Sequence, residues 1–325
     1  MILPNVDTLN MYLFLYDGLM LFATQEGGLH YYVICWTAPV FELTPEQKYE
    51  FDLQGYIVLR AHYDAAAVAT LCAGIDELQA IPIDYATYTR LGVASYYLAA
   101  AMKDPEHPFW QGDHRADRRL NPKTGGVGRV DHALCGTDKF DLIVRDPVLK
   151  AIHTTFAGGP VSISASYFIE KIGPCPGGGL HNGGYPVDRD IYYAYDHTNQ
   201  RFACSSTKSV VILSDMSKVE NGPFAAIPGS HKANFSCPYD MGDASKNRMA
   251  VPVLAAPGDV VIFSESMTHN AYSVSNDSTR RSIFFNYMPS IGRNNLPFQR
   301  MSIYPDHVLE RLDDQLDLIT SPGYI

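Results

Sequence analysis

The chain has 325 residues, of which 46% are hydrophobic and 18% charged, and its formal net charge at pH 7 is −10. This length and apolar content are enough for one large or two small globular domains with a sizeable core. The negative charge, together with the lack of a basic stripe interleaved with aromatic residues, argues against a nucleic-acid polymer as partner because phosphate backbones would be repelled.

The first 42 residues are rich in apolar and aromatic side chains, but Asp7, Asp17 and Glu26 interrupt them before any run is long enough to span a membrane. They contain no basic segment followed by an apolar core and a small-residue cleavage site. Six cysteines are scattered without a C-x-x-C pair, which predicts reduced thiols rather than a zinc knuckle or a disulfide scaffold. We therefore expect a packed N-terminal extension over residues 1–42, a cytoplasmic protein and no membrane association.

Two helices are expected next. Thr44 as N-cap, Pro45 at the first helical position and Gln47 closing a capping box predict a short helix that ends at Gly55. The following stretch, YIVLR, is typical of a strand. Asp64 can then cap a second helix, AAAVATLCAGIDELQ, whose apolar residues recur at roughly helical spacing.

The rest of the chain changes character near residue 150. Residues 86–145, in which Pro, Gly, His and Asp are abundant, are expected to form long loops or short helices. Beyond them come the segments SISASYFIEKI, SVVILSDM, VPVLAA, DVVIFSES and RSIFFNYMPS, separated by turn residues. Many short strands preceded by helices predict a mainly β jelly roll with helices packed outside it, in a single domain over residues 43–325 with its core at about 155–290.

His181, in GGGLHNGG, and His269, in SMTHNAY, lie on either side of this β region, each at the expected end of a strand. A barrel of Greek-key strands can bring two such side chains together. Non-haem iron oxygenases use two histidines and one carboxylate on one face of the metal and leave the opposite positions open. The pair therefore indicates an iron site, although any histidine can also be an ordinary core or surface residue.

Arg280 follows His269 by one loop and part of one strand. A buried arginine can hold a carboxylate through two hydrogen bonds, and 2-oxoglutarate has a distal carboxylate that needs such a partner. Arg281 is the alternative if the register differs by one residue. Because neighbouring strand residues point to opposite faces, only one of the two arginines can serve.

Four segments, in this order, make the chain resemble the phytanoyl-CoA dioxygenase family of Fe(II)/2-oxoglutarate-dependent oxygenases over roughly residues 45–290: FDLQGYIVLR, GPFAAIPGSHKANF, PGDVVIFSESMTH and RRSIFFNY. The resemblance implies a double-stranded β-helix of the cupin-like kind. It also implies iron at His181 and His269, 2-oxoglutarate at Arg280, O2 as oxidant and a small-molecule substrate.

One departure from the family pattern stands out. The family motif is His-x-Asp or His-x-Glu, whereas this chain has His181, Asn182 and Gly183. The triplet is similar to the His-x-Gly or His-x-Ala of iron/2-oxoglutarate halogenases, in which chloride binds where the carboxylate would be. This similarity implies a halogenase that chlorinates an unactivated carbon, with the halide at Gly183 and Asn182 as its hydrogen-bond partner.

Alternatives to halogenation remain open. A carboxylate from elsewhere, namely Asp188, Asp190 or Glu265, can fill the vacant position and restore ordinary hydroxylation. Glu265 can instead accept a hydrogen bond from a ligand histidine, or simply face solvent. A third alternative is a catalytically inactive homologue that binds a metabolite without metal.

For several other candidate residues, a structural role is the preferred interpretation. His231, in PGSHK, is expected to make structural hydrogen bonds rather than bind metal. Tyr192, Tyr193 and Tyr195 can line a substrate pocket, but ordinary strand packing is the favoured interpretation. No Lys-Ser or Lys-Thr follows GGGLHNGG, so a phosphate-binding loop is not expected there.

Overall fold

The computed structural model describes residues 12–16, 19–23, 32–35, 41–93, 101–111, 127–182, 191–290 and 304–320. The chain divides into two compact units, residues 1–42 and 43–325. In the first unit, β1 (Tyr12–Tyr16), β2 (Leu19–Ala23) and β3 (Tyr32–Cys35) form an antiparallel sheet in the order β1-β2-β3. All three segments consist of apolar and aromatic residues, and each contains at least one aromatic residue of the kind that favours strands.

The second unit is built on a six-stranded antiparallel sheet with the strand order β4-β12-β9-β14-β6-β5. Its members are β4 (Tyr56–Leu59), β5 (Val127–Asp131), β6 (Val161–Ile172), β9 (Thr207–Ile212), β12 (Val260–Ser264) and β14 (Thr279–Pro289). The two edge strands, β4 and β5, come from upstream of the predicted core segment, so helical and strand segments alternate in the first part of this unit.

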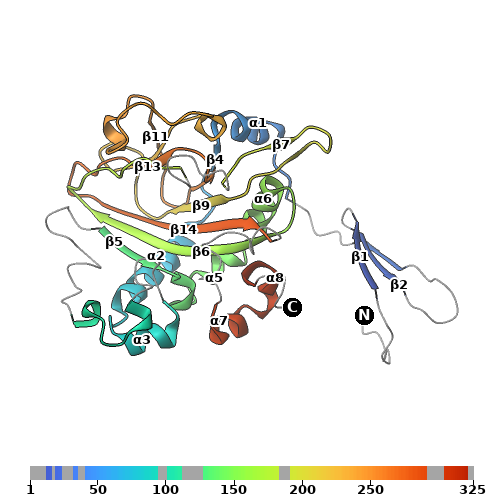
Figure 1. The fold of residues 1–325 in the computed structure, drawn as a ribbon, viewed down its shortest axis with the longest axis horizontal. Helices are drawn as coiled ribbons and strands as arrows, with labels where there is room; N and C mark the ends of the chain where they lie inside the picture. Colours follow the sequence, from blue (N-terminus) through green and yellow to red (C-terminus); the bar gives the residue numbers. More distant parts are fainter. Residues whose placement is uncertain are drawn as a thin grey trace. The chain divides into compact units, whose positions relative to one another are not determined.

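A smaller sheet completes the core. It contains β11 (Val251–Val253), β10 (Phe224–Ala226) and β13 (His269–Ala271) in the order β11-β10-β13, and lies on the opposite side of the large sheet from α2 and α3 (Figure 1). Apolar side chains of both sheets pack together in one cluster, including Val210, Phe224, Ala226, Val261, Phe263 and Phe284. The predicted jelly roll is thereby confirmed. A separate hairpin pairs β7 (Tyr195–Asp196) with β8 (Arg201–Phe202).

The two predicted helices have the predicted N-terminal caps. In α1 (Pro45–Gln54), the Thr44 hydroxyl accepts from the Gln47 amide at 3.2 Å and the Gln47 side chain accepts from the Thr44 amide at 3.0 Å. Gly55, with φ of 87°, ends the helix in the left-handed conformation that favours glycine. Asp64 caps α2 (Ala65–Ala80).

Further helices surround the large sheet. They are α3 (Tyr85–Leu91), α5 (Asp141–Val144), α6 (Pro147–Ala157), α7 (Asp306–Arg311) and α8 (Leu316–Ile319), with short 3-10 turns η2 (Ala101–Lys103), η3 (Pro108–Gln111), η4 (Ala133–Cys135), η5 (Ser230–Lys232), η6 (Ala244–Lys246) and η9 (Asp313–Gln315). Figure 1 shows α2, α3, α5, α7 and α8 on the side of the large sheet that faces away from β11 and β13. The large sheet is therefore covered on both faces.

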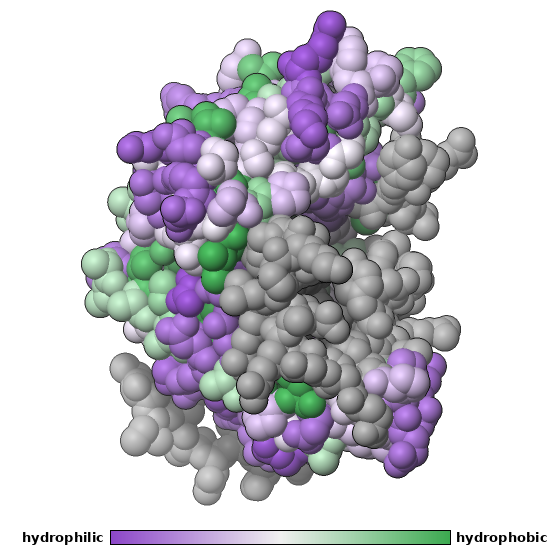
Figure 2. Space-filling model, turned by 90° about the vertical axis from the view of Figure 1, so that its left-hand side faces the viewer, coloured by the Kyte–Doolittle hydropathy of each residue, from purple (hydrophilic) through white to green (hydrophobic). Residues whose placement is uncertain are grey.

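The surface agrees with a globular unit. On the face drawn in Figure 2, the coloured surface is mainly hydrophilic and its apolar residues form small patches.

Free thiols are present at Cys72, Cys135, Cys175, Cys204 and Cys237. Within the described ranges, no helix combines the length and the apolar character that crossing a membrane requires.

Candidate metal and cosubstrate site

The structure brings His181 and His269 together. They form an isolated antiparallel bridge, in which the His181 amide donates to the His269 carbonyl at 3.1 Å and the His269 amide donates back at 2.8 Å. Their ring centroids are 4.5 Å apart. The bridge lies at the end of the small sheet, because His269 is the first residue of β13.

The glycines before His181 allow this close approach. Gly178 donates its amide to the Ala271 carbonyl at 3.0 Å, and a Cβ at Gly178 would lie only 1.7 Å from the Asn270 side-chain oxygen. Any larger residue would push the segment away from β13. Gly178 thus has a structural cause, which is the packing of the histidine segment against the strand that carries the second histidine, whereas a Cβ at Gly179 would make only an ordinary contact of 3.4 Å.

Both imidazole rings are oriented by backbone carbonyls. Nδ1 of His181 lies 3.1 Å from the Gly179 carbonyl, and Nδ1 of His269 lies 2.7 Å from the Met267 carbonyl. A carbonyl can only accept, so the Met267 contact places the proton of the neutral His269 ring on Nδ1 and leaves its Nε2 lone pair free. Nδ1 of His181 also lies 3.2 Å from the side-chain nitrogen of Asn270, which helps to orient that ring. Burial and the neighbouring His181 lower the pKa of His269 to about 3, which keeps its ring neutral.

Glu265 supplies a carboxylate beside the two rings. Its Oε1 lies 4.0 Å from Nε2 of His269, and one potential ligand atom from each of His181, Glu265 and His269 lies within 4.8 Å of the other two. Glu265 is only 7% exposed, so the solvent-facing alternative for this residue is wrong. A tight turn causes this placement: β12 ends at Ser264, and the Met267 amide donates to the Ser264 carbonyl at 2.9 Å.

A buried lysine holds the other oxygen of this carboxylate. Nζ of Lys208, on β9, lies 2.7 Å from Oε2 of Glu265 and 3.2 Å from the Tyr167 hydroxyl. Burial raises the pKa of Glu265, but the Lys208 ammonium outweighs burial and holds that pKa below its usual value. Burial likewise opposes the charge on Lys208, yet the Glu265 carboxylate raises the pKa of the amine. The pair is therefore an ammonium and a carboxylate.

Arg280 and Arg281 point to opposite faces of β14, as expected. Arg280 is 2% exposed and its Nε has no hydrogen-bond partner. Arg281 lies on the other face, where its guanidinium contacts Glu170 at 2.5 Å and Asp76 at 3.0 Å. Because Arg281 is already paired, Arg280 is the arginine available to a ligand, and the alternative register is not needed.

Sequence reasoning missed two polar residues in this interior. Ser282 lies two positions after Arg280, on the same face of β14, and its buried hydroxyl has no hydrogen-bond partner. Lys208 is the one charged residue of a strand that is otherwise small or β-branched, TKSVVI, and that contrast is the signal that could have identified it. A buried charge needs a partner, which for Lys208 is Glu265.

The residues present fit iron and 2-oxoglutarate. Two neutral imidazoles and one carboxylate are the donor set that non-haem Fe(II) prefers. An unpaired buried guanidinium and an unpaired buried hydroxyl are suited to a carboxylate. His181, His269 and Glu265 could hold the metal, and Arg280 with Ser282 could hold the distal carboxylate of the cosubstrate.

The remaining predicted site residues are placed as follows. Gly183, Asp188 and Asp190 lie outside the described residues. Asn182 lines a cavity of about 380 Å³ together with other residues, most of them uncharged and apolar, such as Ile227, Pro228, Met241 and Met249. A halide-binding role for Gly183 and Asn182 stays a prediction. Nε2 of His231 donates to the Asp52 carbonyl at 3.1 Å, as a structural histidine would.

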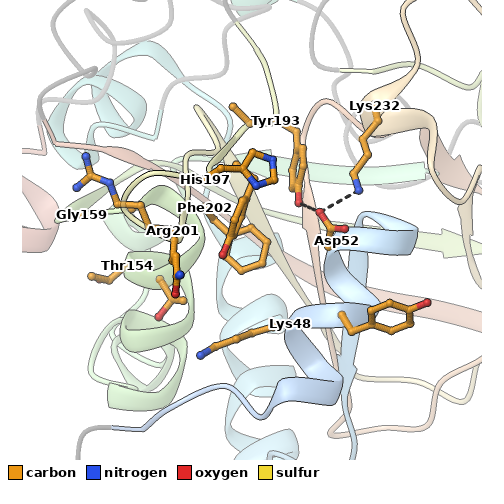
Figure 3. Close-up of a pocket in the computed structure, with 15 residues that line it drawn as sticks. Lys48, Asp52, Thr154, Gly159, Tyr193, His197, Arg201, Phe202 and Lys232 are labelled. Atoms are coloured by element: carbon orange, nitrogen blue, oxygen red, sulfur yellow. Dashed lines mark hydrogen bonds and ion pairs between the residues drawn. The ribbon is translucent and has the colours of Figure 1, made fainter.

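Tyr193 and Tyr195 line a different cavity, of about 1150 Å³, between α1, the end of α6 and the β7–β8 hairpin (Figure 3). The Tyr193 hydroxyl and the Lys232 ammonium both reach the Asp52 carboxylate, the latter at 2.9 Å. The candidate metal ligands His181, Glu265 and His269 do not line this cavity. Tyr192 is exposed.

Known proteins similar to this chain share its fold. HygX from Streptomyces hygroscopicus, solved with nickel and 2-oxoglutarate, superposes with a TM-score of 0.57 at 21% identity, over 76% of this chain and 88% of HygX. The epimerase SnoN from nogalamycin biosynthesis superposes with a TM-score of 0.51 at 18% identity, over 75% of this chain and 82% of SnoN. At these identities the likeness concerns the fold alone.

Sequence comparison adds the family. "Dioxygenase lolE1" of Epichloe uncinata is 29% identical over 164 residues, which span 48% of this chain and 60% of that relative. The family model for phytanoyl-CoA dioxygenase matches residues 51–282, which include His181, Glu265, His269 and Arg280. The chain therefore belongs to the phytanoyl-CoA dioxygenase family.

Proposed function

We propose that this protein is an Fe(II)/2-oxoglutarate-dependent dioxygenase that hydroxylates a small molecule. The observation that carries the proposal is the carboxylate of Glu265 beside His181 and His269. Iron bound there, with 2-oxoglutarate and O2, supplies an oxidant strong enough to hydroxylate an unactivated C–H bond. Support also comes from relatives: HygX has been solved with iron and with 2-oxoglutarate, and lolE1 is named a dioxygenase.

The chain's own residues would perform two tasks. His181, His269 and Glu265 would bind the metal through two imidazole nitrogens and a carboxylate oxygen. Arg280 and Ser282 bind the distal carboxylate of 2-oxoglutarate in a part of the barrel where burial excludes water.

Glu265 also supports hydroxylation over halogenation. A halogenase needs an open metal position for chloride, whereas a carboxylate bound at that position leaves no place for it. The expectation of a halogenase rests on the triplet of His181, Asn182 and Gly183, and Glu265 offers the carboxylate ligand that this triplet lacks. We therefore favour the hydroxylase.

The test is an anaerobic titration with Fe(II) and 2-oxoglutarate that follows the visible charge-transfer band, with and without chloride. We expect a band in the wild-type protein that does not respond to chloride. Glu265→Ala should bind Fe(II) at least about 10-fold more weakly, because a ligand is lost. Glu220→Gln, which removes an exposed carboxylate, is the matched control and should bind like wild type.

Three outcomes would contradict the proposal in different ways. A wild-type band that shifts on adding chloride would favour the halogenase. Unchanged Fe(II) affinity in Glu265→Ala would remove Glu265 from the ligand set. No band under any condition would leave the inactive metabolite-binding homologue as the better interpretation.

A further inference from the structure

Two buried cations lie side by side inside the barrel. Lys171 on β6 is the register partner of Arg280 on β14, and directly opposite residues of an antiparallel pair project from the same face. That face is the inner one, because Tyr167 and Ile169, at alternate positions before Lys171, pack against the interior cluster. Lys171 is 7% exposed.

Neither cation has a carboxylate partner in the described part of the chain. The Lys171 ammonium contacts the Pro176 carbonyl at a long 3.4 Å, and Arg280 Nε has no partner at all. Lys208, the third interior cation, is neutralised by Glu265. Among the described interior residues, Lys171 and Arg280 are thus the two cations without a direct ion pair, and the only carboxylate that favours the charge on Lys171 is the more distant Asp243.

This arrangement is unfavourable without an anion. Burying charge away from water is costly unless it is paired, and two like charges repel each other more strongly where the dielectric is low. Burial and the neighbouring Arg280 lower the pKa of Lys171 to about 8, so the amine still carries its proton at neutral pH. A carboxylate entering from outside the chain would relieve both charges.

We propose that Lys171 is a second cation for the distal carboxylate of 2-oxoglutarate, and that it makes the site selective for a dicarboxylic 2-oxo acid. The inference rests on the proposed function, which supplies the cosubstrate. Arg280 provides the planar fork that carboxylates accept, and Lys171 adds a compact charge from the adjacent strand. A monocarboxylic 2-oxo acid of the same length would leave both charges without an anion.

The test measures binding rather than turnover. Calorimetry on the Ni(II)-loaded protein gives the Kd of 2-oxoglutarate and of 2-oxopentanoate, which lacks the distal carboxylate. Lys171→Met should raise the Kd of 2-oxoglutarate by about 10- to 100-fold, the range expected for losing one hydrogen bond to a charged group. The Kd of 2-oxopentanoate should change by less than about 2-fold, since it does not use this charge.

Two variants and one stability measurement act as controls. Lys171→Arg keeps the charge and should keep the selectivity. Arg281→Met removes a cation from the outer face of β14, the strand that pairs with β6, and should leave both affinities unchanged. Metal-free Lys171→Met should unfold at the same or a higher temperature than wild type, because a buried like-charge repulsion is removed. A merely structural lysine would give the opposite result.

The outcomes separate this proposal from the proposed function. Unchanged 2-oxoglutarate affinity in Lys171→Met, or an equal loss for both acids, would overturn the role of Lys171 while leaving the dioxygenase intact. Wild-type protein that binds neither acid would overturn the dioxygenase itself, and the role of Lys171 with it.

Discussion

Lys208 is an interior residue with a single ionic partner, which makes the cost of its removal predictable. Lys208→Met would leave the Glu265 carboxylate buried without its counter-charge, and breaking such a pair costs about 3–5 kcal/mol. Urea denaturation should show that loss in the metal-free protein. The double variant Lys208→Met/Glu265→Gln should recover most of it, because no charge is then stranded. A double variant as unstable as the single one would contradict this account.

His153 makes stability depend on pH. Its ring is buried between Thr207 and Ser209, with contacts of 2.7 and 2.6 Å to their hydroxyls. Burial lowers the pKa of His153 to about 3, from an ordinary 6.5. Below pH 6.5, His153 is therefore protonated in the unfolded chain but stays neutral in the folded chain. The free energy of unfolding falls as the pH is lowered towards 3.

The expected contribution is about 1.4 kcal/mol per pH unit below 6.5. His153→Gln keeps a hydrogen-bonding side chain but cannot titrate, so its unfolding free energy should fall less steeply between pH 6 and about 4.5. Denaturant melts at several pH values measure the two slopes. Equal slopes would show that another group governs the acid limb.

At the scale of elements, the capping box of α1 contributes a stability increment that can be isolated. Thr44→Ala removes the hydroxyl that satisfies the Gln47 amide, and such losses cost about 1 kcal/mol. Thr70, an exposed residue inside α2 whose hydroxyl bonds to the Ala66 carbonyl, is the matched control. Thr70→Ala should be neutral or slightly stabilising, because alanine is the better helix former. Chemical denaturation measures the unfolding midpoints of the two variants. Equal midpoints would contradict the predicted stabilisation by the Thr44 cap.

At the scale of the whole molecule, the interior clusters and candidate ligands lie within residues 43–325. A chain of residues 43–325 should therefore keep the melting temperature and the Fe(II) affinity of the 325-residue chain. Calorimetry on both chains measures this. A shorter chain that binds Fe(II) more weakly would show that residues 1–42 contribute to the site.

The sequence by itself determined the features that depend on neighbours along the chain or on the order of motifs. Thr44, Gln47 and Asp64 act within one helical turn, so their caps could be predicted, and strand alternation predicted that Arg280 and Arg281 point to opposite faces. The jelly roll followed from the succession of short strands. The two histidines followed from their places at strand ends and from the family resemblance.

Only the tertiary structure decided which distant side chains meet. The sequence left open whether Glu265 faces solvent or the metal site. In the structure, the turn after β12 and the ion pair with Lys208 on β9 hold Glu265 beside His269. Helices α7 and α8 are too short to be stable alone and depend on contacts such as that of Arg311 with Asp141. The physical reason is common to both: burial and charge pairing arise between strands and helices far apart in the chain, and local sequence carries no record of which faces will be opposed.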